Sequence, residues 1–64
     1  FRRSLYFIKD LKAGEIISSN SVRSVRPGFG LAPKYLKRVV GQKVISDVSK
    51  NTPVQNQILE KPLI

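Results

Sequence analysis

The residues of this sequence best suited to chemistry are an arginine and the turn that follows it. They lie in the run Val-Arg-Ser-Val-Arg-Pro-Gly-Phe-Gly at positions 22–30. Pro27 fixes its own φ and removes a backbone donor, and Gly28 and Gly30 allow backbone geometries that other residues avoid. Arg26 therefore stands at the edge of a stiff turn. Its planar, forked guanidinium suits carboxylates, phosphates and amide carbonyls, so the run predicts a residue that positions a polar ligand.

Other interpretations of these side chains stay open from the sequence. Arg26 could instead form a surface salt bridge, or pack its stem over Tyr6 or Phe29. Phe29 is either an aromatic plug against a partner or an ordinary core residue. Lys34 is either a solvated charge or a contact to an acidic partner surface.

No other constellation in the chain suits catalysis. There is no Cys and no His, which excludes disulfides, thiol chemistry and the usual zinc sites. The four acidic residues are scattered and form no pair at a useful spacing for general acid–base work. We therefore expect no catalytic residue and no metal ligand in this chain.

Length and charge limit the classes of function that remain. Sixty-four residues make one small domain, which buries only about 60% of its unfolded surface. No apolar run approaches the roughly 20 residues that span a bilayer, and no apolar segment follows the first arginines as in a signal peptide. A start at Phe1 predicts a piece excised from a longer chain. The net charge of +8 favours an anionic partner, or simply gives a solvated basic surface.

The turn must be positioned by short elements. Strands are expected over residues 4–8 and 22–26, and a helix over 33–40, with Pro33 in its first turn and Gly41 ending it. Leu36, Val39 and Val40 would form the apolar face of that helix. Further extended pieces are expected at residues 16–17 and 42–48, with a helical turn at 18–21.

A weak internal repeat at an offset of 37 predicts two similar halves. Asp10-Leu11 aligns with Asp47-Val48, and Gly14 aligns with Asn51. Gly and Asn are the residues that best tolerate a left-handed turn, so the match falls where backbone geometry matters. Each half reads as strand, tight turn, short strand and helical turn. The sequence predicts a mostly β domain with short helical turns and internal pseudo-two-fold symmetry.

Three blocks of the sequence resemble the SAF domain. They are Lys-Asp-Leu-Lys-Ala-Gly-Glu at 9–15, Arg-Pro-Gly-Phe-Gly at 26–30 and Val-Gly-Gln-Lys at 40–43. More closely, nearly the whole chain is similar to the C-terminal, antifreeze-like domain of the sialic acid synthase family. Residues 23–36 are most similar to its pseudaminic acid synthase branch. The resemblance implies the β-clip, or pretzel, fold shared with type III antifreeze proteins.

The same resemblance implies a role within a larger enzyme. In that family a TIM barrel, absent here, condenses phosphoenolpyruvate with an N-acetylated amino sugar and uses a divalent metal, Mn or Mg. The antifreeze-like domain covers the barrel mouth of the partner subunit in a domain-swapped homodimer, in the cytoplasm. Its Arg-Pro-Gly arginine, here Arg26, reaches the sugar. Pro27, Gly28 and Gly30 shape the loop, and Phe29 and Lys34 are candidates for contact with the partner.

Three other functions are each suggested by one feature of the sequence or by the resemblance. Ice binding needs a flat, neutral face of small residues, whereas this chain has one Thr, two Ala and a strong positive charge. Nucleic-acid binding fits the charge, but the five aromatics form no interleaved stacking pattern and no basic helix or zinc finger is visible. A SAF carbohydrate-binding or pilus or flagellar assembly-chaperone module is the remaining alternative, and an export signal upstream would favour it. We expect neither nucleic acid nor membrane as a partner.

Overall fold

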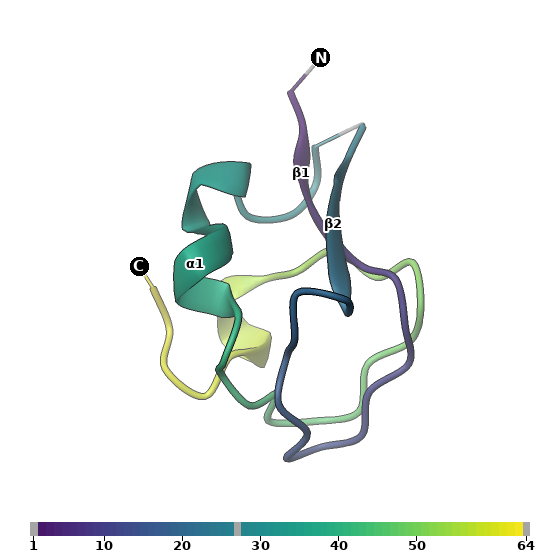
Figure 1. The fold of residues 1–64 in the computed structure, drawn as a ribbon, viewed down its shortest axis with the longest axis vertical. Coiled ribbons are helices and arrows are strands. Elements are labelled where there is room, and N and C mark those ends of the chain that lie inside the picture. The colour runs from purple at the N-terminus through teal and green to yellow at the C-terminus, as the bar shows by residue number, and fades with distance from the viewer. Residues whose placement is uncertain (1, 27, 64) are drawn as a thin grey trace.

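Two short strands form the regular sheet at the centre of the molecule. The computed structural model describes residues 2–26 and 28–63. Within them, β1 (Ser4–Phe7) and β2 (Val22–Val25) pair in an antiparallel sheet (Figure 1). Both predicted strands are confirmed, and each ends one residue earlier than predicted.

The predicted helix forms in two parts beside these strands (Figure 1). It begins as a 3-10 turn, η1 (Pro33–Tyr35), with Pro at its start, and continues as one α-helical turn, α1 (Leu36–Val39). Gly41 follows with a φ of +97°, the left-handed geometry expected of a glycine that ends a helix. The predicted apolar face is only partly right. Val39 is fully buried, but Leu36 lies at the edge of the face and is 39% exposed.

The strand predicted over residues 42–48 is wrong. This segment makes only isolated bridges: Lys43 and Val48 pair with Ile16 and Leu11 in one antiparallel register, and Val44 pairs with Leu59. The pairing with residues 11–16 is interrupted between these two bridges, at the bends of Ile45 and Ser46, so no continuous ladder forms. A second 3-10 turn, η2 (Asn56–Ile58), follows.

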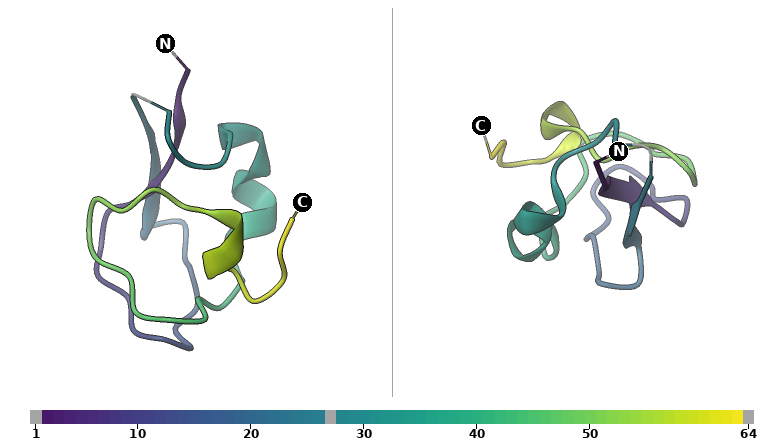
Figure 2. Two further views of the ribbon diagram at one scale, coloured as in Figure 1. Left: turned by 180° about the vertical axis from the view of Figure 1, so that it is seen from behind. Right: turned by 90° about the horizontal axis from the view of Figure 1, so that it is seen from above.

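The backbone hydrogen bonds repeat at the offset of 37. Leu11 and Val48, equivalent positions in the two halves, bond to each other, with N···O distances of 2.9 Å and 2.8 Å. Gly14 and Asn51 both adopt positive φ, +88° and +72°, as the repeat predicts. Figure 2 shows the two loops running side by side, and the mutual hydrogen bonds of Leu11 and Val48 join them.

Two carboxylates hold the halves together in equivalent ways. Asp10 Oδ1 accepts a hydrogen bond from Lys50 N at 2.7 Å, and Asp47 Oδ1 accepts one from Ala13 N at 2.8 Å. The two bonds are equivalent at the offset of 37, because Asp10 corresponds to Asp47 and Ala13 corresponds to Lys50. Each half therefore caps the tight turn of the other.

We expect Asp10→Ala and Asp47→Ala to lower the free energy of unfolding by similar amounts, about 1 kcal/mol each, because each removes one solvent-exposed hydrogen bond to a charged group. Urea denaturation followed by circular dichroism measures this. Glu60→Ala removes an exposed carboxylate with no side-chain hydrogen bond described here, and serves as the control. A large loss at one aspartate and none at the other would contradict the symmetric arrangement.

The core lies between the two halves and the helix. Its residues are apolar, are almost fully removed from solvent, and come from β1, β2, α1 and the loops between the elements: Leu5, Phe7, Leu11, Ile17, Val22, Leu31, Val39, Val44, Val48, Val54 and Leu59. One buried polar side chain, Ser4, stands on β1 beside the turn that carries Arg26. Ser4 thus joins the core to that turn through its side chain.

Candidate functional site

Arg26 follows directly after the last residue pair of the β1–β2 ladder, Ser4 with Val25. It is exposed. Among residues 2–26 and 28–63, no ion pair or hydrogen bond occupies its guanidinium. The salt bridge that the sequence left open is therefore not formed within the described residues.

Backbone packing explains the two glycines of the turn. A Cβ at Gly28 would lie 2.6 Å from the carbonyl oxygen of Arg2. A Cβ at Gly30 would collide with the carbonyl oxygen of Leu5 and lie 3.0 Å from the backbone N and O of Val54. Gly30 has no positive φ, so the requirement there is for space and not for an unusual dihedral angle. Pro27 lies outside the described residues.

The end of the turn is tied to both halves of the domain. Gly30 N donates to Ser4 Oγ at 2.9 Å, and Gln55 Nε2 donates to the carbonyl oxygen of Phe29 at 2.6 Å. Leu31 N donates to Val54 O at 2.8 Å. Neither Ser4 nor Gln55 was predicted from the sequence to hold this turn. The one signal for Ser4 was a small polar residue opening an otherwise apolar strand, and Gln55 gave none.

The two candidates for partner contact are both on the surface. Phe29 is 68% exposed, so it is not a core aromatic. Lys34 is exposed, and its Nζ lies 5.3 Å from the ring centre of Tyr35. Arg38 Cζ lies 5.9 Å from the same ring. Lys34 thus belongs to a small cluster of two cations around one tyrosine, which has no acidic partner among the described residues.

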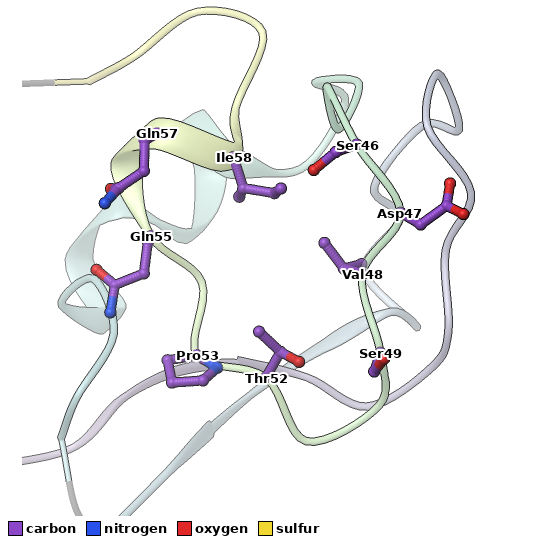
Figure 3. Close-up of a pocket in the computed structure, with 9 residues that line it drawn as sticks. All are labelled: Ser46, Asp47, Val48, Ser49, Thr52, Pro53, Gln55, Gln57 and Ile58. Atoms are coloured by element: carbon purple, nitrogen blue, oxygen red, sulfur yellow. The ribbon is translucent and has the colours of Figure 1, made fainter.

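A shallow hollow of about 450 Å³ lies next to the turn (Figure 3). Its lining is neutral apart from one carboxylate: Ser46, Asp47, Val48, Ser49, Thr52, Pro53, Gln55, Gln57 and Ile58. In Figure 3 Val48 and Ile58 point toward each other across it, while Asp47 points away. Gln55 is the residue that the hollow and the turn share.

Two further features bear on the class of site. Among the described residues, no three His, Cys, Asp or Glu side chains are grouped so that they could hold a metal ion. No described helix has the length and apolar character needed to cross a membrane.

Comparison with known proteins decides the family. The family model described as "SAF domain" matches residues 2–60. This chain is a SAF domain. The similarity inferred from the blocks around Lys9, Arg26 and Val40 is thereby confirmed.

The SAF domain matches the C-terminal region of pseudaminic acid synthases. It is 40% identical over 63 residues to pseudaminic acid synthase of Helicobacter pylori, covering 98% of this chain and 18% of that protein. It is 52% identical over 48 residues to pseudaminic acid synthase of Campylobacter jejuni strain 81-176, covering 75% of this chain and 14% of that protein. The chain therefore spans less than a fifth of these relatives.

A solved structure shows the same fold. The spore coat polysaccharide biosynthesis protein SpsE of Bacillus subtilis superposes with a TM-score of 0.80 at 16% identity, over 89% of this chain and 17% of that protein. The SAF domain is thus a small, mostly β domain with one short helix, as predicted in outline.

Proposed function

We propose that this SAF domain is the non-catalytic C-terminal module of a nonulosonic acid synthase, of the pseudaminic acid branch. In this proposal the domain, residues 1–64, belongs to a longer chain and has the β-clip fold. It covers the active site of the partner subunit in a domain-swapped homodimer. The catalytic TIM barrel and its divalent metal, Mn or Mg, lie elsewhere in that cytoplasmic enzyme. The relatives named above, all much longer, support this assignment.

Arg26 is the residue we assign to the amino-sugar substrate. The observation that carries this assignment is an exposed guanidinium without any partner among the described residues, mounted on a turn whose backbone is held by close packing. The nearby backbone of this turn is anchored, so it is mainly the arginine side chain that must be ordered when a ligand binds. Arg26 can therefore orient the sugar for attack, which is how positioning residues contribute to rate.

The alternative partners fit these observations less well. The +8 charge, with no ion pair among the described residues, would attract any anion, including nucleic acid. Yet the exposed aromatic at the turn is a single Phe29, and no row of aromatics accompanies it for stacking on bases. The cluster of Lys34, Tyr35 and Arg38 suits an acidic protein surface, which a barrel rim would supply.

Arg26→Ala in the full-length protein tests the proposal. We expect the KM for the sugar to rise, or kcat to fall, by about 10-fold to 100-fold, the equivalent of one hydrogen bond to a charged group. The KM for phosphoenolpyruvate should stay near the wild-type value. Steady-state kinetics with phosphoenolpyruvate and either N-acetylmannosamine or the diacetamido-trideoxy sugar would measure both.

Two further variants sharpen the test. Arg26→Lys keeps the charge and loses the fork, so it should recover only part of the activity. Arg23→Ala removes an exposed arginine from β2, the strand that ends just before Arg26, and should leave the kinetics unchanged. Wild-type kinetics for Arg26→Ala would refute the role of Arg26.

A further inference from the structure

Position 55 departs from the internal repeat in a way that points to a function. Ser18 and Gln55 are equivalent at the offset of 37, and each begins a helical turn through its carbonyl oxygen, to Ser21 N at 3.0 Å and to Ile58 N at 3.2 Å. The Ser18 side chain stays within its own turn, 2.9 Å from Ser21 Oγ. Gln55 makes no such capping bond. Its side chain reaches instead to Phe29, 26 residues away.

The bond from Gln55 is one half of a clamp on a single peptide group. The carbonyl of Phe29 and the N–H of Gly30 belong to the same planar peptide unit and point in opposite directions. Gln55 Nε2 donates to the carbonyl at 2.6 Å, and Ser4 Oγ accepts from the N–H at 2.9 Å. Ser4 is 1% exposed, so its side of the clamp is fixed in the core. The peptide plane is held from both sides and cannot rotate without losing both bonds.

We infer that Gln55, with Ser4, is a positioning residue that fixes the direction in which the turn presents Arg26. The inference rests on the function proposed for Arg26. Rotation of the clamped peptide would move the backbone three residues from Arg26 and swing its long side chain away from a fixed ligand. Small misplacements of this kind are costly to catalysis. Gln55 is half-buried on the wall of the hollow in Figure 3, so its side chain can be altered without opening the core.

Gln55→Glu in the full-length synthase is the decisive variant. It keeps the size of the side chain but replaces the donor with an acceptor that repels the Phe29 carbonyl. We expect the sugar KM to rise about threefold to tenfold, the range that one hydrogen bond allows. The KM for phosphoenolpyruvate should stay unchanged, and the free energy of unfolding should fall by no more than about 1 kcal/mol. Gln55→Ser, the residue of the first repeat, should show the same kinetic loss because it cannot reach Phe29.

Gln57→Glu is the matched control. Gln57 lines the same hollow, is exposed, and makes the same change of charge without touching the turn. It should leave the kinetics unchanged. If Gln57→Glu raised the sugar KM as much as Gln55→Glu, the effect would be one of charge and the clamp would be refuted.

A double-mutant cycle with Arg26→Ala separates this inference from the proposed function. If Gln55 acts through Arg26, then Gln55→Glu should have no further effect once Arg26 is alanine. Full additivity of the two losses would overturn the inference. Normal kinetics for Gln55→Glu, with a loss for Arg26→Ala, would overturn the inference alone. Normal kinetics for Arg26→Ala would overturn the proposed function and the clamp's role with it.

Discussion

Gly30→Ala is expected to lower the free energy of unfolding by about 3 kcal/mol, the upper end of the range for overpacking a close-packed site. The new Cβ would collide with the carbonyl oxygen of Leu5 and press on the backbone of Val54. These two residues are themselves joined by a hydrogen bond, Val54 N to Leu5 O at 2.9 Å. Neither can move aside without breaking that bond, so the strain cannot be relieved locally.

Two other glycine variants provide the comparison. Gly28→Ala meets the carbonyl of Arg2, which precedes the β1 ladder and is exposed, so a small shift of Arg2 should limit the loss to about 1 kcal/mol. Gly14→Ala meets no atom within 4 Å, and its cost of about 1 kcal/mol comes from the left-handed φ of +88° alone. Urea denaturation of all three should place Gly30→Ala far below the others. Equal stability of Gly30→Ala and wild type would show that residue 30 is not wedged between the two segments.

The parts of the fold that the sequence predicted are those in which local geometry selects a residue type. A left-handed backbone selects Gly or Asn, so Gly14 and Asn51 mark the two tight turns and reveal the repeat. Asp10 and Asp47 are identical because each accepts a hydrogen bond from the turn of the other half. These constraints act on single residues, and each leaves a trace in the sequence.

The parts that it could not predict depend on which distant segments meet. The apolar residues of 42–48 suggest a strand, but a sequence pattern does not show whether the pairing with a partner segment is continuous. The clamp on the Phe29–Gly30 peptide joins residues 26 positions apart on both sides, Ser4 and Gln55. A glutamine that reaches a carbonyl looks like any other polar residue until the fold brings the two together. Arg26 was singled out because its turn has a distinctive composition and resembles the Arg-Pro-Gly motif of the family, and its role stays a prediction.

Phe7→Ala should bring the domain close to unfolding. Phe7 is fully buried and is the largest of the fully buried side chains described. Truncating a buried phenylalanine costs about 3–5 kcal/mol. A 64-residue domain has a total stability of only about 3–10 kcal/mol at the usual value per residue. Its repeat counterpart, Val44, is equally buried but loses only two methyl groups on truncation, so Val44→Ala should cost about 1.6 kcal/mol.

Circular dichroism during urea denaturation would measure both losses, with Phe7→Leu as the conservative control, which removes less volume and should cost less than Phe7→Ala. A loss below 1 kcal/mol for Phe7→Ala would contradict the core described here. The effect on function should also differ from that of Gln55→Glu. Phe7 lies on β1, the strand that carries Ser4, so its truncation releases the clamp only by unfolding the domain. Activity and stability should therefore fall together in Phe7→Ala, whereas in Gln55→Glu the sugar KM should rise with a loss of stability of at most about 1 kcal/mol.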